Sequence, residues 1–277
     1  MDVSIIIAHY DPGNNAECRE AFQETLRRIQ RQTDSLSAEV IVADDGSPEN
    51  GHIHSLTREK LYSDDRQVAL LRGKELADWI GDKDPVLQVV THWLYLPKKE
   101  LCMAKARLWN LATHLADSPL LVFFDDDNYM LQDSALKHCL SLLKTYELVF
   151  GQIQDNSGRF RPYSSHRVQG TTFGVHRQIL EAIGGFGEWT ETVSSGIDSD
   201  LWWKLFQHFQ RNPELRACYT TEFQTRDSCS KRWKPFIRQF FRHRAVARQF
   251  QLQHGCKNYR SVQHNPSRNK ANWIQEL

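Results

Sequence analysis

The sequence lacks the features that mark secreted, membrane-spanning or zinc-binding proteins. Its six cysteines include no Cys-x-x-Cys pair, which favours reduced thiols over a disulfide framework. None of the 12 histidines stands at zinc-ligand spacing with another ligand, so a zinc site is not expected. No apolar run reaches the roughly 18 residues that a membrane span needs, and Met1 to Ser4 lead into a strand rather than a signal peptide. We therefore expect a cytoplasmic protein without repeats or low-complexity tracts.

The length and charge of the chain allow one large domain, or one domain with an appended subdomain. It has 277 residues, of which 40% are hydrophobic and 25% charged. The net charge of +1 conceals an asymmetry, because the segment from Arg226 to Lys270 is rich in Lys and Arg and contains Asp227 as its one acid. The rest of the chain is net acidic. An acidic partner is therefore expected for the C-terminal part.

Short apolar runs separated by helical patterns indicate an α/β fold. Helical spacing of apolar residues extends from Ala16 to Gln32 and from Leu101 to Ala116. Strands that alternate with helices predict a Rossmann-like, doubly wound, mostly parallel sheet. The predicted strands are Val3–Ala8, Val40–Ala43, Val68–Leu71 and Leu120–Phe124.

Acidic and aromatic residues follow three of these strands. They are His9-Tyr10-Asp11, Asp44-Asp45 and Asp125-Asp126-Asp127. Since ligands of such sheets bind beyond the carboxyl ends of the strands, the three loops should meet at one edge. Three adjacent carboxylates repel one another, and the usual reason to hold them together is Mg²⁺ or Mn²⁺ carrying nucleotide phosphates. An acidic, solvated turn is the alternative.

The remaining segments are less regular. Residues 73–97 look like an insertion, to which the sequence assigns no role. Beyond Gly151 the pattern predicts a strand over Arg167–Val175, a short helix over His176–Ile183, and a helix capped by Asp198. A last helix is predicted from Pro235 to Phe250.

Six motifs stand in order along the chain: Val3–Asp11, Val40–Ser47, Lys105–Asn110, Asp125–Asp127, Gly184–Glu188 and Gly196–Leu201. Together they resemble family 2 glycosyltransferases of the GT-A fold over residues 2–210. The third departs from the family pattern because two residues separate Arg107 from Asn110; in the fifth, Gly187 replaces Asp, and in the sixth, Ile197 replaces Glu. The fourth matches the family's DxD motif.

The resemblance implies a role for each candidate residue. Asp198 would be the catalytic base, although a helix cap is the alternative. Asp125 and Asp127 would hold Mn²⁺ or Mg²⁺, with His243 as a further metal ligand. Asp200 would support the helix or the acceptor. The nucleotide sugar would be bound by His9, Tyr10, Asp11, Asp44, Lys105, Arg107, Asp125 and Asp126.

Three of these nucleotide contacts have ordinary structural alternatives. Asp44 would accept from the nucleotide base, or would instead form an Asx-type turn. Tyr10 would stack on the base, or would pack within its loop. Lys105 and Arg107 would reach the diphosphate, although a solvated helix face is an alternative for Lys105.

The resemblance implies a metal-dependent, inverting glycosyltransferase. It would transfer a sugar from a nucleoside diphosphate sugar, with UDP favoured, to a glycan or polyprenyl-linked acceptor in bacterial surface polysaccharide synthesis. One rival is a sugar-nucleotide nucleotidyltransferase, which usually has a Gly-rich basic loop after its first strand; here residues 9–15 contain only Gly13 and neither Lys nor Arg. The other rival is a non-catalytic module that binds a membrane or nucleic acid; we expect no nucleic acid partner.

The C-terminal segment 231–250 combines aromatic and basic residues. At helical spacing, Trp233, Phe236 and Phe240 share one face, and Lys234, Arg238 and Arg242 share another. This pattern predicts contact with a membrane surface, at the inner face of the cell membrane. A helix packed on the sheet is the alternative. The predicted division is a GT-A domain over 1–225, with a nucleotide-binding half (1–128) and an acceptor-binding half (129–225), and a basic helical extension over 226–277.

Overall fold

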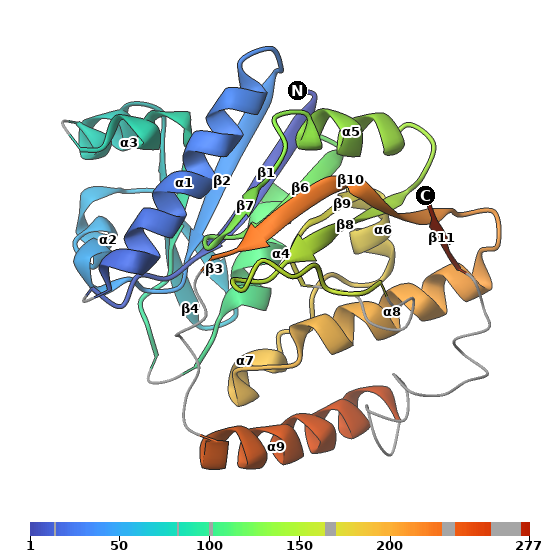
Figure 1. Ribbon diagram of the computed structural model, residues 1–277. Coiled ribbons are helices and arrows are strands. Elements are labelled where there is room, and N and C mark those ends of the chain that lie inside the picture. Colours follow the sequence, from blue (N-terminus) through green and yellow to red (C-terminus); the bar gives the residue numbers. More distant parts are fainter. Residues whose placement is uncertain (14, 82, 100–101, 164–169, 229–235, 256–272) are drawn as a thin grey trace.

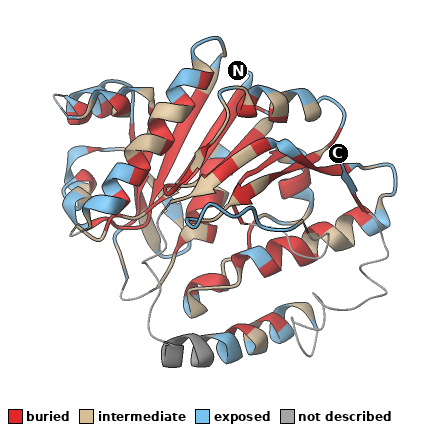
Figure 2. Ribbon diagram, viewed as in Figure 1, coloured by how far each residue is buried: buried red, intermediate tan, exposed pale blue. Residues whose placement is uncertain are grey.

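A computed structural model of the chain has an 11-stranded sheet at its centre, covered by helices on both faces (Figure 1). It describes all residues except 14, 82, 100–101, 164–169, 229–235 and 256–272, and gives no side-chain description for 236–242. Within the described chain, each helix is too short or too polar to cross a membrane. The central strands are largely red in Figure 2 because they are buried between the two helical layers.

The sheet order is β11-β10-β8-β9-β6-β1-β2-β5-β4-β3, with β7 paired to β10. The strands β6, β1, β2 and β5 run parallel, while β9 and β4 pair antiparallel with their neighbours. The strands are β1 (Val3–His9), β2 (Ala38–Asp44), β3 (Lys60–Ser63), β4 (Arg66–Arg72), β5 (His92–Tyr95), β6 (Leu120–Asp125), β7 (Asn128–Met130), β8 (Leu148–Gln154), β9 (Phe173–His176), β10 (Ala217–Asp227) and β11 (Ile274–Glu276).

Two hydrophobic cores flank the sheet. Helices α1, α3 and α5 cover one face, and α4, α6, α8 and α9 contribute to the core on the other. The helices are α1 (Ala16–Thr33), α2 (Ile53–Leu56), α3 (Gly73–Ile80), α4 (Lys105–Leu115), α5 (Ala135–Leu142), α6 (Arg177–Ala182), α7 (Thr190–Val193), α8 (Ile197–Arg211) and α9 (Phe236–His254), with 3-10 turns at Pro48–Asn50 and Pro85–Val89.

The predicted strands and main helices are present, with two corrections. Residues 73–97 are not an insertion, because they supply α3 and β5, and β5 lies in the sheet next to β2. Asp198 is not the cap of α8: the cap position is Gly196, whose φ of 97° favours glycine, and Asp198 is the second helical residue. The strand predicted from Arg167 begins at Phe173, and residues 164–169 lie outside the described part.

The C-terminal part is joined to the same sheet and core. β10 continues past residue 225, and β11 pairs with it. On α9, Val246 and Phe250 are buried. The division at 225/226 stays a prediction, and the aromatic and basic side chains predicted to meet a membrane lie outside the described residues.

Candidate active site

Three loops meet at the carboxyl edge of the parallel strands, as the sequence predicts. In the strand pairing, His9 at the end of β1 lies opposite Asp44 at the end of β2. On its other side, Ala8 lies opposite Asp125 at the end of β6. The register of the parallel strands β6, β1 and β2 brings these residues from distant parts of the sequence to one edge of the sheet.

Asp125 and Asp126 of the triplet have different surroundings. Asp125 is partly exposed, and its Oδ1 lies 2.5 Å from Lys105 Nζ. Asp126 is buried and its Oδ2 accepts from His9 Nδ1 at 2.9 Å and from the Tyr10 backbone N–H at 3.0 Å. Asp126 and His9 therefore join the ends of β6 and β1.

The triplet fits a metal that is shared with phosphates. Among the described residues, no group of three or more His, Cys, Asp and Glu side chains forms a site from protein ligands alone. Mg²⁺ is commonly held by one or two carboxylates together with substrate phosphates and water. Asp125 and Asp127 are carboxylates of this kind, and Asp125 is partly exposed with an ammonium as its partner.

His243 is the one predicted metal ligand that the structure does not bring to the triplet. It lies exposed on α9. Among the described residues it forms no group of metal ligands with Asp125 and Asp127. The prediction rested on the distance along the chain after Asp198, and this distance does not determine the direction in which a helix packs.

Asp44 is turned into the protein rather than toward a ligand. It is fully buried. Its Oδ1 accepts from Ser47 N at 2.8 Å, and its Oδ2 accepts from Asn50 Nδ2 at 2.8 Å and Trp93 Nε1 at 3.2 Å. This is the turn interpretation that the sequence left open. With its oxygens so occupied, Asp44 is not placed to accept from a nucleotide base.

Tyr10 has a neighbour that sequence reasoning missed. Lys98 Nζ lies 4.4 Å from the centre of the Tyr10 ring and 2.5 Å from Asp45 Oδ2. Burial raises the pKa of Asp45 to about 6, against the lowering effect of Lys98. Lys98 follows β5, so its position could be inferred only once residues 92–95 were recognised as a sheet strand.

Asp11 holds the loop after β1 together. Its Oδ1 accepts from the Gly13 backbone N–H at 2.8 Å, and its Oδ2 accepts from Arg19 Nε at 2.9 Å. Its own N–H donates to Ser47 Oγ at 2.9 Å, which ties the first loop to the second. These bonds shape the loop around Tyr10.

Lys105 and Asp198 are brought together through Gly170. Lys105 Nζ donates to the Gly170 carbonyl at 3.3 Å as well as to Asp125. A Cβ on Gly170 would lie 1.9 Å from Asp198 Oδ1, so the Asp198 carboxylate lies directly against this glycine. Lys105 therefore contacts both the candidate metal ligand Asp125 and Gly170, the glycine against which the candidate base Asp198 lies.

Arg107 belongs to a different cluster. It is buried and pairs with Glu191 at 3.0 Å, Asp64 at 3.0 Å and Glu188 at 3.3 Å. Arg66 also pairs with Glu191. Because its guanidinium is engaged by three carboxylates, Arg107 joins α4 to α7 and the β3–β4 turn and is not brought to the triplet, where the diphosphate was expected.

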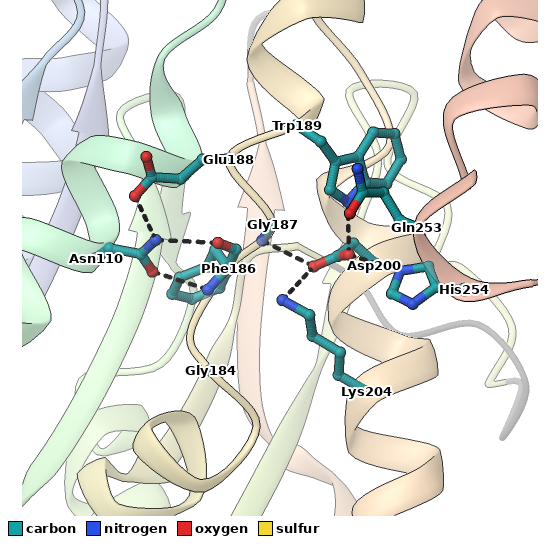
Figure 3. A pocket seen from close by; sticks show the side chains of 10 residues that line it. All are labelled: Asn110, Gly184, Phe186, Gly187, Glu188, Trp189, Asp200, Lys204, Gln253 and His254. Carbon is teal, nitrogen blue, oxygen red and sulfur yellow. Dashed lines mark hydrogen bonds and ion pairs between the residues drawn. The ribbon is translucent and has the colours of Figure 1, made fainter. Parts of the chain in front are cut away.

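Asp200 borders a polar pocket on the other side of the first turn of α8 (Figure 3). The pocket has a volume of about 620 Å³. Asp200 is fully buried and accepts from Gly187 N, Trp189 Nε1 and His254 Nε2, each at 2.8 Å, and from Lys204 Nζ at 3.0 Å. Burial acts to raise the pKa of Asp200, but the His254 hydrogen bond and the Lys204 charge outweigh it, so the pKa lies below its ordinary value.

The Asp200 contacts explain one departure from the family motifs. A Cβ at position 187 would lie 2.6 Å from Asp200 Cγ, so Gly187 leaves room for the carboxylate. An Asp at this position, as the family pattern has, would need Asp200 to move. Asp200 therefore joins the first turn of α8 to the loop at Gly187 and to α9.

The fold matches solved glycosyltransferases at low sequence identity. The mannosyltransferase PcManGT from Pyrobaculum calidifontis, in complex with GDP-Man and Mn²⁺, is 16% identical, with a TM-score of 0.58 over 98% of this chain and 70% of its own. TarS of S. aureus is 14% identical, with a TM-score of 0.54; the match covers 91% of this chain and 40% of TarS. A shorter TarS structure in complex with UDP-GlcNAc is 14% identical, with a TM-score of 0.50; the match covers 91% of this chain and 67% of that structure.

These matches establish the fold alone: the chain has the GT-A architecture that the sequence predicts. No protein-family model and no curated protein matches it.

Proposed function

We propose that the chain is a metal-dependent, inverting glycosyltransferase that uses a nucleoside diphosphate sugar. The observation that supports this most directly is the meeting of Asp125, Lys105, Gly170 and Asp198 at the carboxyl edge of the sheet. A carboxylate suited to a metal and a carboxylate suited to a base then flank one place, at which a sugar phosphate could react. Two neighbours of the same fold carry a nucleotide sugar, in one case with Mn²⁺.

Each residue has a defined task in this proposal. Asp125 and Asp127 would hold Mg²⁺ or Mn²⁺, which offsets the charge developing on the leaving diphosphate. Asp198 would accept the proton of the acceptor hydroxyl, which attacks the anomeric carbon from the side opposite the diphosphate. The ring of Tyr10 would stack on the nucleotide base, with Lys98 close enough to donate to a base carbonyl.

Our choice of donor and acceptor class rests on the family resemblance and not on contacts in the structure. We favour a UDP-sugar as donor, and a glycan or polyprenyl-linked acceptor of surface polysaccharide synthesis. Contact of segment 231–250 with a membrane is part of the same hypothesis, and binding to anionic vesicles would test it. The nucleotidyltransferase alternative is weakened because the first loop, residues 9–15, has a single glycine and contains neither Lys nor Arg.

A screen of sugar nucleotides for slow, metal-dependent hydrolysis tests the function. We expect hydrolysis of one donor with Mn²⁺ or Mg²⁺, and none with Asp127→Asn, which should also weaken UDP binding in the presence of Mn²⁺. With an acceptor, Asp198→Asn should lower turnover by about a hundredfold or more at nearly unchanged donor affinity. Full activity in EDTA would contradict the proposed metal, and an unimpaired Asp198→Asn enzyme would contradict the proposed base.

A further inference from the structure

Lys105 contacts one of the two carboxylates that the proposed mechanism uses, Asp125, and the backbone of the glycine that lies against the other. Its ammonium is 2.5 Å from Asp125 Oδ1 and 3.3 Å from the Gly170 carbonyl, against which Asp198 lies. It is also 4.0 Å from the centre of the Trp109 ring, and its side chain is only 12% exposed. Its place is therefore set by packing as well as by charge.

A metal on Asp125 would conflict with this position. Mg²⁺ binds carboxylate oxygens at about 2.0–2.1 Å. With Lys105 Nζ 2.5 Å from the same carboxylate, the ammonium and the dication would be close neighbours in a partly buried site, where like charges repel more strongly than in water. Lys105 and the metal therefore compete for Asp125.

The diphosphate of a donor offers Lys105 another partner. Lysine binds phosphate oxygens as a mobile point charge on a flexible stem. Lys105 is also the first residue of α4, so its end of the helix presents backbone N–H groups and the positive end of the helix dipole. A diphosphate next to this helix end would attract the ammonium away from Asp125.

We propose that Lys105 is an exchangeable counter-ion, which neutralises Asp125 until the donor binds and then moves to the diphosphate, leaving Asp125 to the metal. This rests on the proposed function and adds an order to it: metal and donor bind together rather than independently. By linkage, the donor strengthens metal binding by the same factor by which the metal strengthens donor binding. Removing the Lys105 charge should uncouple the two.

The test measures Mn²⁺ binding from the EPR signal of free Mn²⁺, without and with UDP, after subtraction of Mn²⁺ bound by UDP alone. Without UDP, we expect Lys105→Met to bind Mn²⁺ roughly tenfold more tightly than the wild type. The factor by which UDP strengthens Mn²⁺ binding should then be roughly tenfold smaller in Lys105→Met than in the wild type. Lys105→Arg keeps the charge and should stay coupled. Lys99→Met removes the same charge from a nearby exposed side chain and should behave as the wild type.

The outcomes separate this inference from the proposed function. If UDP strengthens Mn²⁺ binding equally in the wild type and Lys105→Met, and their affinities without UDP are equal, the counter-ion role is overturned and the function stands. If UDP does not strengthen Mn²⁺ binding to the wild type, both fail. Lys105→Gln, which also removes the charge, replaces the Met variant if thermal unfolding shows that the latter is not folded.

Discussion

Asp198 and Asp200 lie two residues apart in one helical turn, and the structure predicts opposite consequences for the same substitution at each. Asp198 is exposed and lies against Gly170, whereas Asp200 is fully buried with four donors. Asp198→Asn should therefore impair turnover without loss of stability. Asp200→Asn should impair stability, which makes the two variants matched controls for each other.

The magnitude for Asp200 follows from its partners. Breaking a buried charge pair costs about 3–5 kcal/mol, because the remaining charged groups are left without a partner. In Asp200→Asn, the amide N–H₂ would also face one of the donors from Gly187, Trp189 or His254. For a domain of this size, the loss corresponds to a fall of roughly 10 °C in Tm. Exposed Asp198→Asn should change the free energy of unfolding by less than about 0.5 kcal/mol.

The dependence on pH provides a second check. Because the folded-state pKa of Asp200 is lowered, its stabilisation is present above the unfolded pKa and is lost as the pH falls through the folded value. The stability difference between wild type and Asp200→Asn should therefore be constant near neutral pH and shrink below about pH 4. Urea unfolding at pH 7 and below pH 4 measures it. An Asp200→Asn protein as stable as the wild type at pH 7 would refute the reasoning.

Two further predictions concern Asp45 and Gly170. Burial raises the pKa of Asp45 from 3.8 to about 6, so ionising this carboxyl at higher pH destabilises the folded state. Between about pH 4.5 and 7.5 the wild type should therefore lose about 2 kcal/mol of unfolding free energy relative to Asp45→Asn. Urea unfolding measures this difference, and equal pH profiles for the two proteins would contradict it. A methyl group on Gly170 would displace Asp198, so Gly170→Ala should lower turnover by roughly a hundredfold at unchanged UDP affinity. Gly51→Ala, where the methyl meets only ordinary contacts, is its control, and normal turnover of Gly170→Ala would show that Asp198 needs no such placement.

The sequence by itself determined the parallel centre of the sheet and the loops at its edge. Runs such as Ile5-Ile6-Ile7 and Val40-Ile41-Val42 are buried because β-branched residues in an unbroken apolar stretch fit a strand covered on both faces. Acids follow β2 and β6 in the sequence, and parallel neighbours bring their carboxyl ends together without further information.

Only the tertiary structure decided what each acid does. Asp44, Asp126 and Asp200 are buried, and their carboxylates accept hydrogen bonds from side chains that lie far away in the sequence or on other elements. Trp93 donates to Asp44, His9 to Asp126 and His254 to Asp200. β5 escaped recognition because its four residues are defined by pairing with β2 and β4 rather than by a local pattern. Local preferences fix strands and helices, but a carboxylate is assigned to a turn, an ion pair or a ligand by the donors that packing brings to it.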